Sequence, residues 1–117
     1  MHKKINLNEK IFIAGSSGMV GQAINRNLVK SGYGLNSNGG KLLTPNRKEL
    51  DLLDAEMVKD WFYRNKPTIV ILAAARVGGI LANLESPTEF ILENIKIQNN
   101  IIENAWKFGV KRLIFLG

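Results

Sequence analysis

Cysteine is absent from this chain of 117 residues. Its absence excludes a disulfide framework, a cysteine-ligated zinc site and a thiol nucleophile, and it agrees with a reducing compartment. Long hydrophobic runs are also absent, because the longest, Thr68 to Ala75, has the length of a strand, whereas a membrane span needs about 18 apolar residues. Gly15 interrupts the apolar run of residues 11–14 before it reaches the length of a signal peptide. We therefore expect a cytoplasmic protein that does not bind membranes.

Acidic residues are few relative to basic ones. Sixteen Lys and Arg against ten Asp and Glu give a net charge of +6, which favours anionic ligands. The basic residues are scattered along the chain, with short clusters at residues 2–4 and 111–112, so we expect no nucleic-acid groove. Apolar residues make up 45% and charged residues 22%, as in globular proteins, and the length fits one domain or part of one.

Short apolar runs alternate with helical patterns along the chain. Strands are predicted at residues 10–14, 41–44, 51–53, 68–74 and 112–116. Helices are predicted after Gly18, after the capping residue Asp54 and after Ser86. The alternation indicates an α/β fold, a partial Rossmann-like doubly wound parallel sheet of about five strands in the order 3-2-1-4-5. Because the last strand meets the end of the chain without a helix to cover it, we expect the chain to be truncated after the fifth strand.

The last predicted helix carries two kinds of residue. Its buried stripe is expected to be made by five apolar residues, Ile91, Ile95, Ile101, Ile102 and Ala105. Its polar face is rich in amides, which either serve an interface or are solvated.

A glycine-rich turn directly follows the first predicted strand and opens the first helix. It consists of Gly15, Ser16, Ser17, Gly18, Met19, Val20 and Gly21. In this position the glycines let phosphates approach the backbone N–H groups at a helix N-terminus, and Gly21 lets helix and sheet pack closely. The turn therefore predicts dinucleotide binding, with a plain tight turn as the alternative. A P-loop is excluded, because no Gly-Lys-Ser/Thr follows.

The segment after the second predicted strand bears on the choice between NAD and NADP. NAD sites place an acidic residue there, whereas NADP sites place a cation near the extra phosphate. This chain has no acid in residues 42–47 and has Arg47 instead. Arg47 therefore favours NADP, and the alternative is an ordinary surface arginine.

Two further segments lie at the predicted carboxyl ends of strands. Asp51, Leu52 and Leu53 are within reach of an adenine in the same crevice, or form a plain strand end. The small residues that follow the fourth strand, from Ala73 to Ile80, either permit close approach by cofactor or substrate or form a structural loop.

Together these segments resemble the GDP-L-fucose synthases, which are extended short-chain dehydrogenase/reductases. The resemblance rests on the glycine turn, residues 47–54, residues 73–80 with their Ala-Arg-Val-Gly-Gly-Ile stretch, the helix at 94–102 and the last strand at 112–117. It implies conversion of GDP-4-keto-6-deoxymannose to GDP-fucose by two epimerisations and an NADPH-dependent reduction. It also implies that the full-length protein is a homodimer, formed by packing two helices per subunit into a bundle.

The resemblance also assigns roles to residues. Gly15, Gly18, Met19, Val20 and Gly21 would line NADP, and Arg47 would meet its 2′-phosphate. Leu53 would contact adenine, and four residues would border the nicotinamide end, namely Ala73, Ala74, Ala75 and Arg76. Ser17 stands where the family commonly has a second phosphate-binding arginine, so the preference for NADP is expected to be modest.

The family's catalytic serine, tyrosine and lysine come after the strand that ends this chain. We therefore expect residues 1–117 to be the NADP-binding domain of a GDP-sugar enzyme without its substrate domain, and to be inactive alone because no general acid is present. The alternatives are a catalytically inactive dinucleotide-binding or assembly module, and a fragment of another nucleotide-sugar epimerase or dehydratase.

Overall fold

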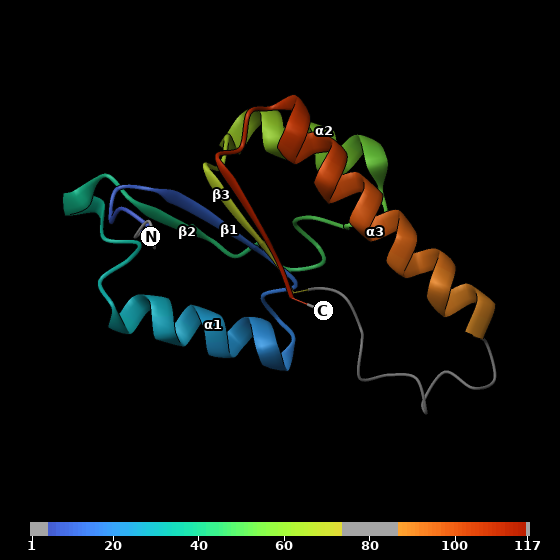
Figure 1. Cartoon of the computed structure of the whole chain (residues 1–117), viewed down its shortest axis with the longest axis horizontal. Coiled ribbons are helices and arrows are strands. Elements are labelled where there is room, and N and C mark those ends of the chain that lie inside the picture. The colour runs from blue at the N-terminus through green and yellow to red at the C-terminus, as the bar shows by residue number, and fades with distance from the viewer. Residues whose placement is uncertain (1–4, 74–86, 117) are drawn as a thin grey trace.

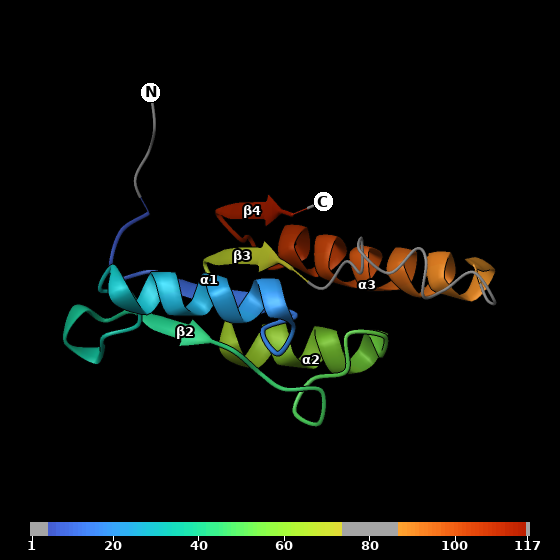
Figure 2. The same cartoon turned by 90° about the horizontal axis from the view of Figure 1, so that it is seen from below.

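The computed structural model describes residues 5–73 and 87–116. Within them, four strands form one sheet in the order β2-β1-β3-β4, and every neighbouring pair is parallel (Figure 2). The strands are β1 (Lys10–Ala14), β2 (Lys41–Leu43), β3 (Ile69–Leu72) and β4 (Arg112–Phe115). Helices α1 (Met19–Lys30), α2 (Ala55–Asn65) and α3 (Pro87–Lys107) connect them, and a short 3-10 helix, η1 (Asn36–Asn38), precedes β2. The predicted Rossmann-like α/β class is confirmed.

The strand predicted at residues 51–53 does not form, so the sheet lacks the outer strand of the expected order. Residues 52 and 53 form a turn instead. The Asp51 carboxylate accepts a hydrogen bond from the Leu53 N–H at 3.0 Å, and the Asp51 carbonyl accepts one from the Asp54 N–H at 3.0 Å. These local bonds satisfy backbone groups that a strand would pair with its neighbour, which is why an aspartate here favours a turn. When the strand predicted at residues 51–53 is left out of the predicted order 3-2-1-4-5, the remaining order of strands is the observed order β2-β1-β3-β4.

The sheet is covered on both faces. Helix α1 lies on one face, and helices α2 and α3 lie on the other (Figure 1). On the α1 side, the buried strand residues Ile11, Ile13, Ile69 and Ile71 pack with Ile24 and Leu28 of the helix. On the other side, Phe12, Ala14, Val70 and Leu72 pack with residues of α2 and α3, among them Val58, Phe62 and Ile101. Residues 11–14 of β1 and all of β3 are buried on both faces of the sheet, and both runs are accordingly apolar throughout.

Aromatic rings fill the core between the sheet and α2. The ring centroid of Phe12 lies 4.2 Å from that of Trp61 and 5.6 Å from that of Phe62, whose ring stands nearly perpendicular to it at 80°. Phe62 also stacks on Phe108 beyond the end of α3, with centroids 6.3 Å apart. The predicted cap of α2 is confirmed, since the Asp54 carboxylate accepts a hydrogen bond from the Met57 N–H at 3.1 Å.

The stripe predicted to be buried along α3 is only partly buried. Ile101 and Ala105 lie in the core, but Ile91, Ile95 and Ile102 are 55%, 47% and 42% exposed. The helix rests on the sheet and α2 with one face only, and its N-terminal half extends past the ends of the strands (Figures 1 and 2). In the described part of the chain, no helix combines the length and apolarity needed to cross a membrane.

The order of the strands places a crevice at the carboxyl edge of the sheet. The chain passes from β1 to β2 on one side, and then from β2 to β3 on the other side of β1. Helix α1, which follows β1, and helix α3, which follows β3, lie on opposite faces of the sheet (Figure 1), and open α/β sheets bind ligands at such a point.

Phe62 is fully buried and its ring contacts those of Phe12, Trp61 and Phe108, which leads to the first prediction. We expect Phe62→Ala to lower the free energy of unfolding by about 3–5 kcal/mol, because it leaves a cavity among packed aromatic rings. The neighbouring Tyr63 is 64% exposed, so Tyr63→Ala should cost about 1 kcal/mol or less. Urea denaturation followed by tryptophan fluorescence measures both values, and equal losses would contradict the described core.

Candidate functional site

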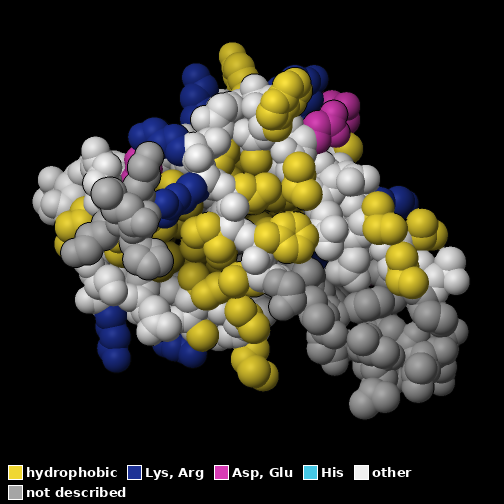
Figure 3. Space-filling view, in the orientation of Figure 1, with side chains coloured by type: hydrophobic (Ala, Val, Ile, Leu, Met, Phe, Trp, Pro, Cys, Tyr) yellow, Lys and Arg dark blue, Asp and Glu magenta, His cyan; other side chains and the backbone are white. Residues whose placement is uncertain are grey.

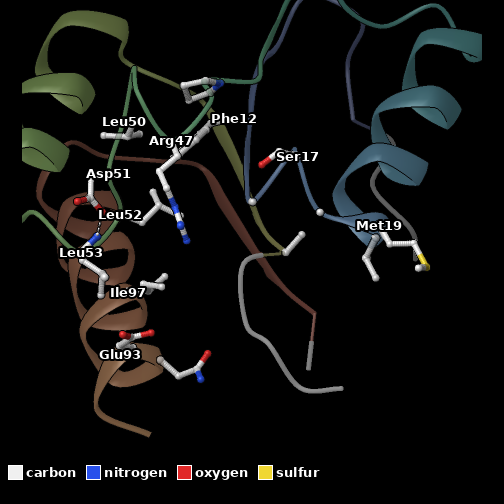
Figure 4. Close-up of a pocket in the computed structure, with 16 residues that line it drawn as sticks. Phe12, Ser17, Met19, Arg47, Leu50, Asp51, Leu52, Leu53, Glu93 and Ile97 are labelled. Carbon is white, nitrogen blue, oxygen red and sulfur yellow. Dashed lines mark hydrogen bonds between the residues drawn. The ribbon is translucent and has the colours of Figure 1, made fainter. Parts of the chain in front are cut away.

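A cavity of about 360 Å³ opens at the carboxyl edge of the sheet, a size typical of small-molecule sites. Its walls come from the glycine turn, the segment between β2 and α2, the residue after β3, and α3 (Figure 4). The lining residues are Phe12, Gly15, Ser17, Gly18, Met19, Val20, Pro45, Arg47, Leu50, Asp51, Leu52, Leu53, Ala73, Glu93, Asn94 and Ile97.

The glycine turn presents the start of α1 to this cavity. Gly15 has a φ of 88°, which requires glycine, and its carbonyl accepts a hydrogen bond from the Gly18 N–H at 3.1 Å. Gly18 caps α1 without a side-chain hydrogen bond, and the first turn of the helix has no acidic residue. The first N–H groups of a helix lack partners within it and carry a partial positive charge. The turn is therefore suited to bind an anion.

Gly21 and Ser16 support the turn without lining the cavity. A Cβ on the buried Gly21 would lie 2.1 Å from the Gly15 carbonyl oxygen and 2.8 Å from the Ser16 Cα. Gly21 was expected to let helix and sheet pack closely; in the structure its close approach is to the backbone of the glycine turn between β1 and α1. The Ser16 hydroxyl donates a hydrogen bond to the Pro45 carbonyl at 3.4 Å, which connects the glycine turn to the segment after β2.

Arg47 is presented by a rigid turn of its own. Asn46 and Glu49 cap each other: the Asn46 side chain accepts from the Glu49 N–H at 2.9 Å, and the Glu49 carboxylate accepts from the Asn46 N–H at 3.3 Å. The same reciprocal arrangement occurs in capping boxes at helix starts. From this turn the Arg47 guanidinium extends into the cavity, between the glycine turn and the wall made by residues 51–53 (Figure 4).

The wall opposite the glycine turn is partly apolar and partly acidic. Leu52, Leu53 and Ile97 supply apolar surface, and Asp51 and Glu93 supply carboxylates (Figure 4). The cavity thus has a cationic and N–H-rich side suited to phosphates, and a side suited to a flat apolar group that carries hydrogen-bond donors.

Most of the sequence-predicted site residues that the structure describes line this one cavity. They are Gly15, Ser17, Gly18, Met19, Val20, Arg47, Asp51, Leu52, Leu53 and Ala73. Ser16 and Gly21 lie behind the turn, as described above. Ala74, Ala75 and Arg76 fall outside the described residues.

Sequence reasoning missed several lining residues. Phe12 lies in the middle of β1, where the continuous apolar run indicates only burial, and Pro45 and Leu50 flank Arg47 without a motif of their own. Glu93, Asn94 and Ile97 line the cavity because α3 extends past the strand ends. The amide-rich composition of α3 was a signal of polar function, but it did not specify which face meets the cavity.

Comparison with known proteins agrees with this geometry. Residues 11–117 match the profile of the NAD dependent epimerase/dehydratase family. The chain belongs to this family. GDP-L-fucose synthase 1 of Arabidopsis thaliana is 46% identical over 108 residues, which are 92% of this chain and 32% of that protein. The GDP-L-fucose synthase of Escherichia coli K12 is 44% identical over 93% of this chain and 32% of its own length. The resemblance to GDP-L-fucose synthases is therefore confirmed.

Two solved structures of similar sequence have the same fold. DdhaC matches with a TM-score of 0.85 and 44% identity, covering 96% of this chain and 30% of that one. MlghC, the GDP-mannoheptose C4 reductase from Campylobacter jejuni with NADP bound, matches with a TM-score of 0.85 and 38% identity, over 97% of this chain and 34% of its own. The chain spans about a third of the length of these relatives.

The contact at Gly21 leads to the second prediction. We expect Gly21→Ala to lower the free energy of unfolding by about 1–3 kcal/mol, because the added methyl group meets backbone that cannot move without distorting the turn. Gly18→Ala is the matched control, since its φ is −75° and its nearest contact would be 3.5 Å away. Thermal unfolding measures both, and the close-packing argument fails if Gly21→Ala is as stable as Gly18→Ala.

Proposed function

We propose that residues 1–117 form the NADP-binding domain of a GDP-sugar epimerase/reductase of the GDP-L-fucose synthase kind, and that its substrate domain and catalytic serine, tyrosine and lysine are not in this chain. The observation that carries the proposal is that Arg47 and the glycine turn, which are 26 or more residues apart, face one cavity. Together they provide a cation and free helix N–H groups for a ligand with two separate phosphate sites.

The residues of the cavity suit the parts of NADP. The pyrophosphate would lie at the turn between Gly15 and Gly18, and the 2′-phosphate would meet Arg47. The adenine would lie on Leu52 and Leu53, near the Asp51 carboxylate. Ala73 would border the nicotinamide end, together with Ala74, Ala75 and Arg76. The solved structure of MlghC, a relative, has NADP bound, which supports this choice of cofactor.

Bound NADPH would supply the hydride for reduction of a 4-keto sugar. This chain's own part in the reaction would be to bind and orient the cofactor. Proton transfer and sugar recognition would come from groups outside residues 1–117. The relatives described above are named as GDP-L-fucose synthases and a GDP-mannoheptose reductase, which supports a GDP-sugar as the substrate class.

The exposed apolar face of α3 supports a homodimer. Ile91, Ile95, Ile102 and Trp106 follow one another at steps of 4, 7 and 4 residues, which places them on one face of the helix, and Trp106 is 84% exposed. Figure 3 shows hydrophobic side chains over the N-terminal half of α3 and a second group over β4, where Leu113 and Phe115 are 36% and 45% exposed. We propose that α3 packs against α3 of a second copy in the full-length protein.

The role of Arg47 gives the third prediction. We expect NADPH to bind about tenfold more tightly than NADH, a modest preference because Ser17 replaces a second cation, and Arg47→Ala to remove this preference. Calorimetric titration with both cofactors measures it. Lys48→Ala is the control, because Lys48 is exposed on the same turn but does not line the cavity. Equal affinities in the wild type would exclude Arg47 from the site.

The α3 face gives the fourth prediction. We expect the chain to associate reversibly at high concentration and Ile95→Lys to weaken this association about tenfold or more, because a charge would be buried in the interface. Val29→Lys on α1 is the matched control, since Val29 is 58% exposed on the other side of the sheet. Sedimentation equilibrium measures the association constant of the wild type and of both variants. A monomer at every concentration, or equal effects of the two variants on association, would contradict the proposal.

A further inference from the structure

The wall of the cavity formed by residues 51–53 is not part of any helix or strand, so its shape depends on individual hydrogen bonds. One of them comes from far along the chain. The Asn100 side-chain amide donates a hydrogen bond to the Leu52 carbonyl at 2.8 Å. Asn100 lies on α3, 48 residues away in sequence, and does not line the cavity.

The bond from Asn100 completes the restraint of one peptide unit. The Leu52 carbonyl and the Leu53 N–H belong to the same planar peptide group. Asn100 holds the carbonyl, and the Asp51 carboxylate holds the N–H at 3.0 Å (Figure 4 shows the latter bond). With both polar groups bound, the peptide plane cannot rotate without breaking a hydrogen bond, and the flanking Leu52 and Leu53 keep their places along the wall.

Asn100 is itself well supported. Its backbone carbonyl accepts a hydrogen bond from the side-chain amide of Asn104 at 2.7 Å, and Asn104 is only 6% exposed. The next residue, Ile101, is fully buried in the core. The donor is therefore mounted on a part of α3 that is anchored in the core.

We propose that Asn100 is a positioning residue for the cofactor, which holds the 51–53 wall in the shape that receives the adenine. The inference rests on the proposed NADP site and deepens it. A preformed wall does not have to be ordered when the ligand binds, so the hydrogen bond strengthens affinity without touching the ligand. Because Asn100 acts on the adenine wall and not on Arg47, it affects NADPH and NADH equally.

The test replaces Asn100 by leucine, which has nearly the same size, carries no charge and cannot donate a hydrogen bond. We expect Asn100→Leu to raise the dissociation constants of NADPH, NADH and 2′,5′-ADP by a common factor of about ten. The ratio of the NADPH and NADH dissociation constants and the binding stoichiometry should stay unchanged. Asn100→Gln, which keeps an amide donor, should recover part of the loss. Asn99→Leu is the matched control, because Asn99 is the exposed neighbour on the same helix. Calorimetric titration gives the dissociation constant and the stoichiometry separately.

The possible outcomes separate the two proposals. Loss of stoichiometry at an unchanged dissociation constant would show that Asn100 only maintains the fold and would overturn the inference. So would a dissociation constant within about twofold of the wild type. If Asn100→Leu does not fold, the dissociation constants of Asn100→Asp and Asn99→Asp are compared instead. Both variants add the same charge, and only Asn100→Asp should bind the three ligands more weakly. A wild-type chain that binds none of the three ligands would refute the NADP site itself, and this inference with it.

Discussion

The parallel pairing of β1 with strands on both of its sides is the constraint on which the rest of this structure depends. Ile11 and Phe12 align with residues of both β2 and β3, Ile13 aligns with Ile71 of β3, and all three are fully buried. Parallel strands bring all their carboxyl ends to one edge. The glycine turn, the segment that carries Arg47 and the residue after β3 therefore meet at that edge, although they are far apart in sequence.

The walls of the cavity are made in different ways. The glycine turn is shaped by steric fit, since Gly21 can approach the Gly15 carbonyl only because it has no Cβ. The Arg47 turn and the 51–53 wall are shaped by side chains that bond to the backbone, through Asn46, Glu49 and Asp51. Such bonds keep a loop ordered before a ligand arrives, which reduces the entropy that binding must overcome.

Helix α3 has two apolar faces with different surroundings. Ile101 and Ala105 complete the core under the sheet, while Ile95 and Trp106 remain at the surface. Its N-terminal half extends past the strands and brings Glu93 and Ile97 to the cavity. One helix thus contributes to the core, to the proposed cofactor site and to the proposed dimer interface.

The sequence by itself determined the fold class, the glycine turn and the position of Arg47, because strand and helix periods and the requirement of Gly15 for a positive φ are local properties. It also determined the cap at Asp54, where a side chain bonds to backbone three residues away. Only the tertiary structure decided that Asn100 holds the Leu52 carbonyl in the 51–53 wall, because that bond joins segments 48 residues apart. The exposure of Ile91, Ile95 and Ile102 was likewise decided there, since hydrophobic periodicity marks an apolar face of a helix but not what covers it.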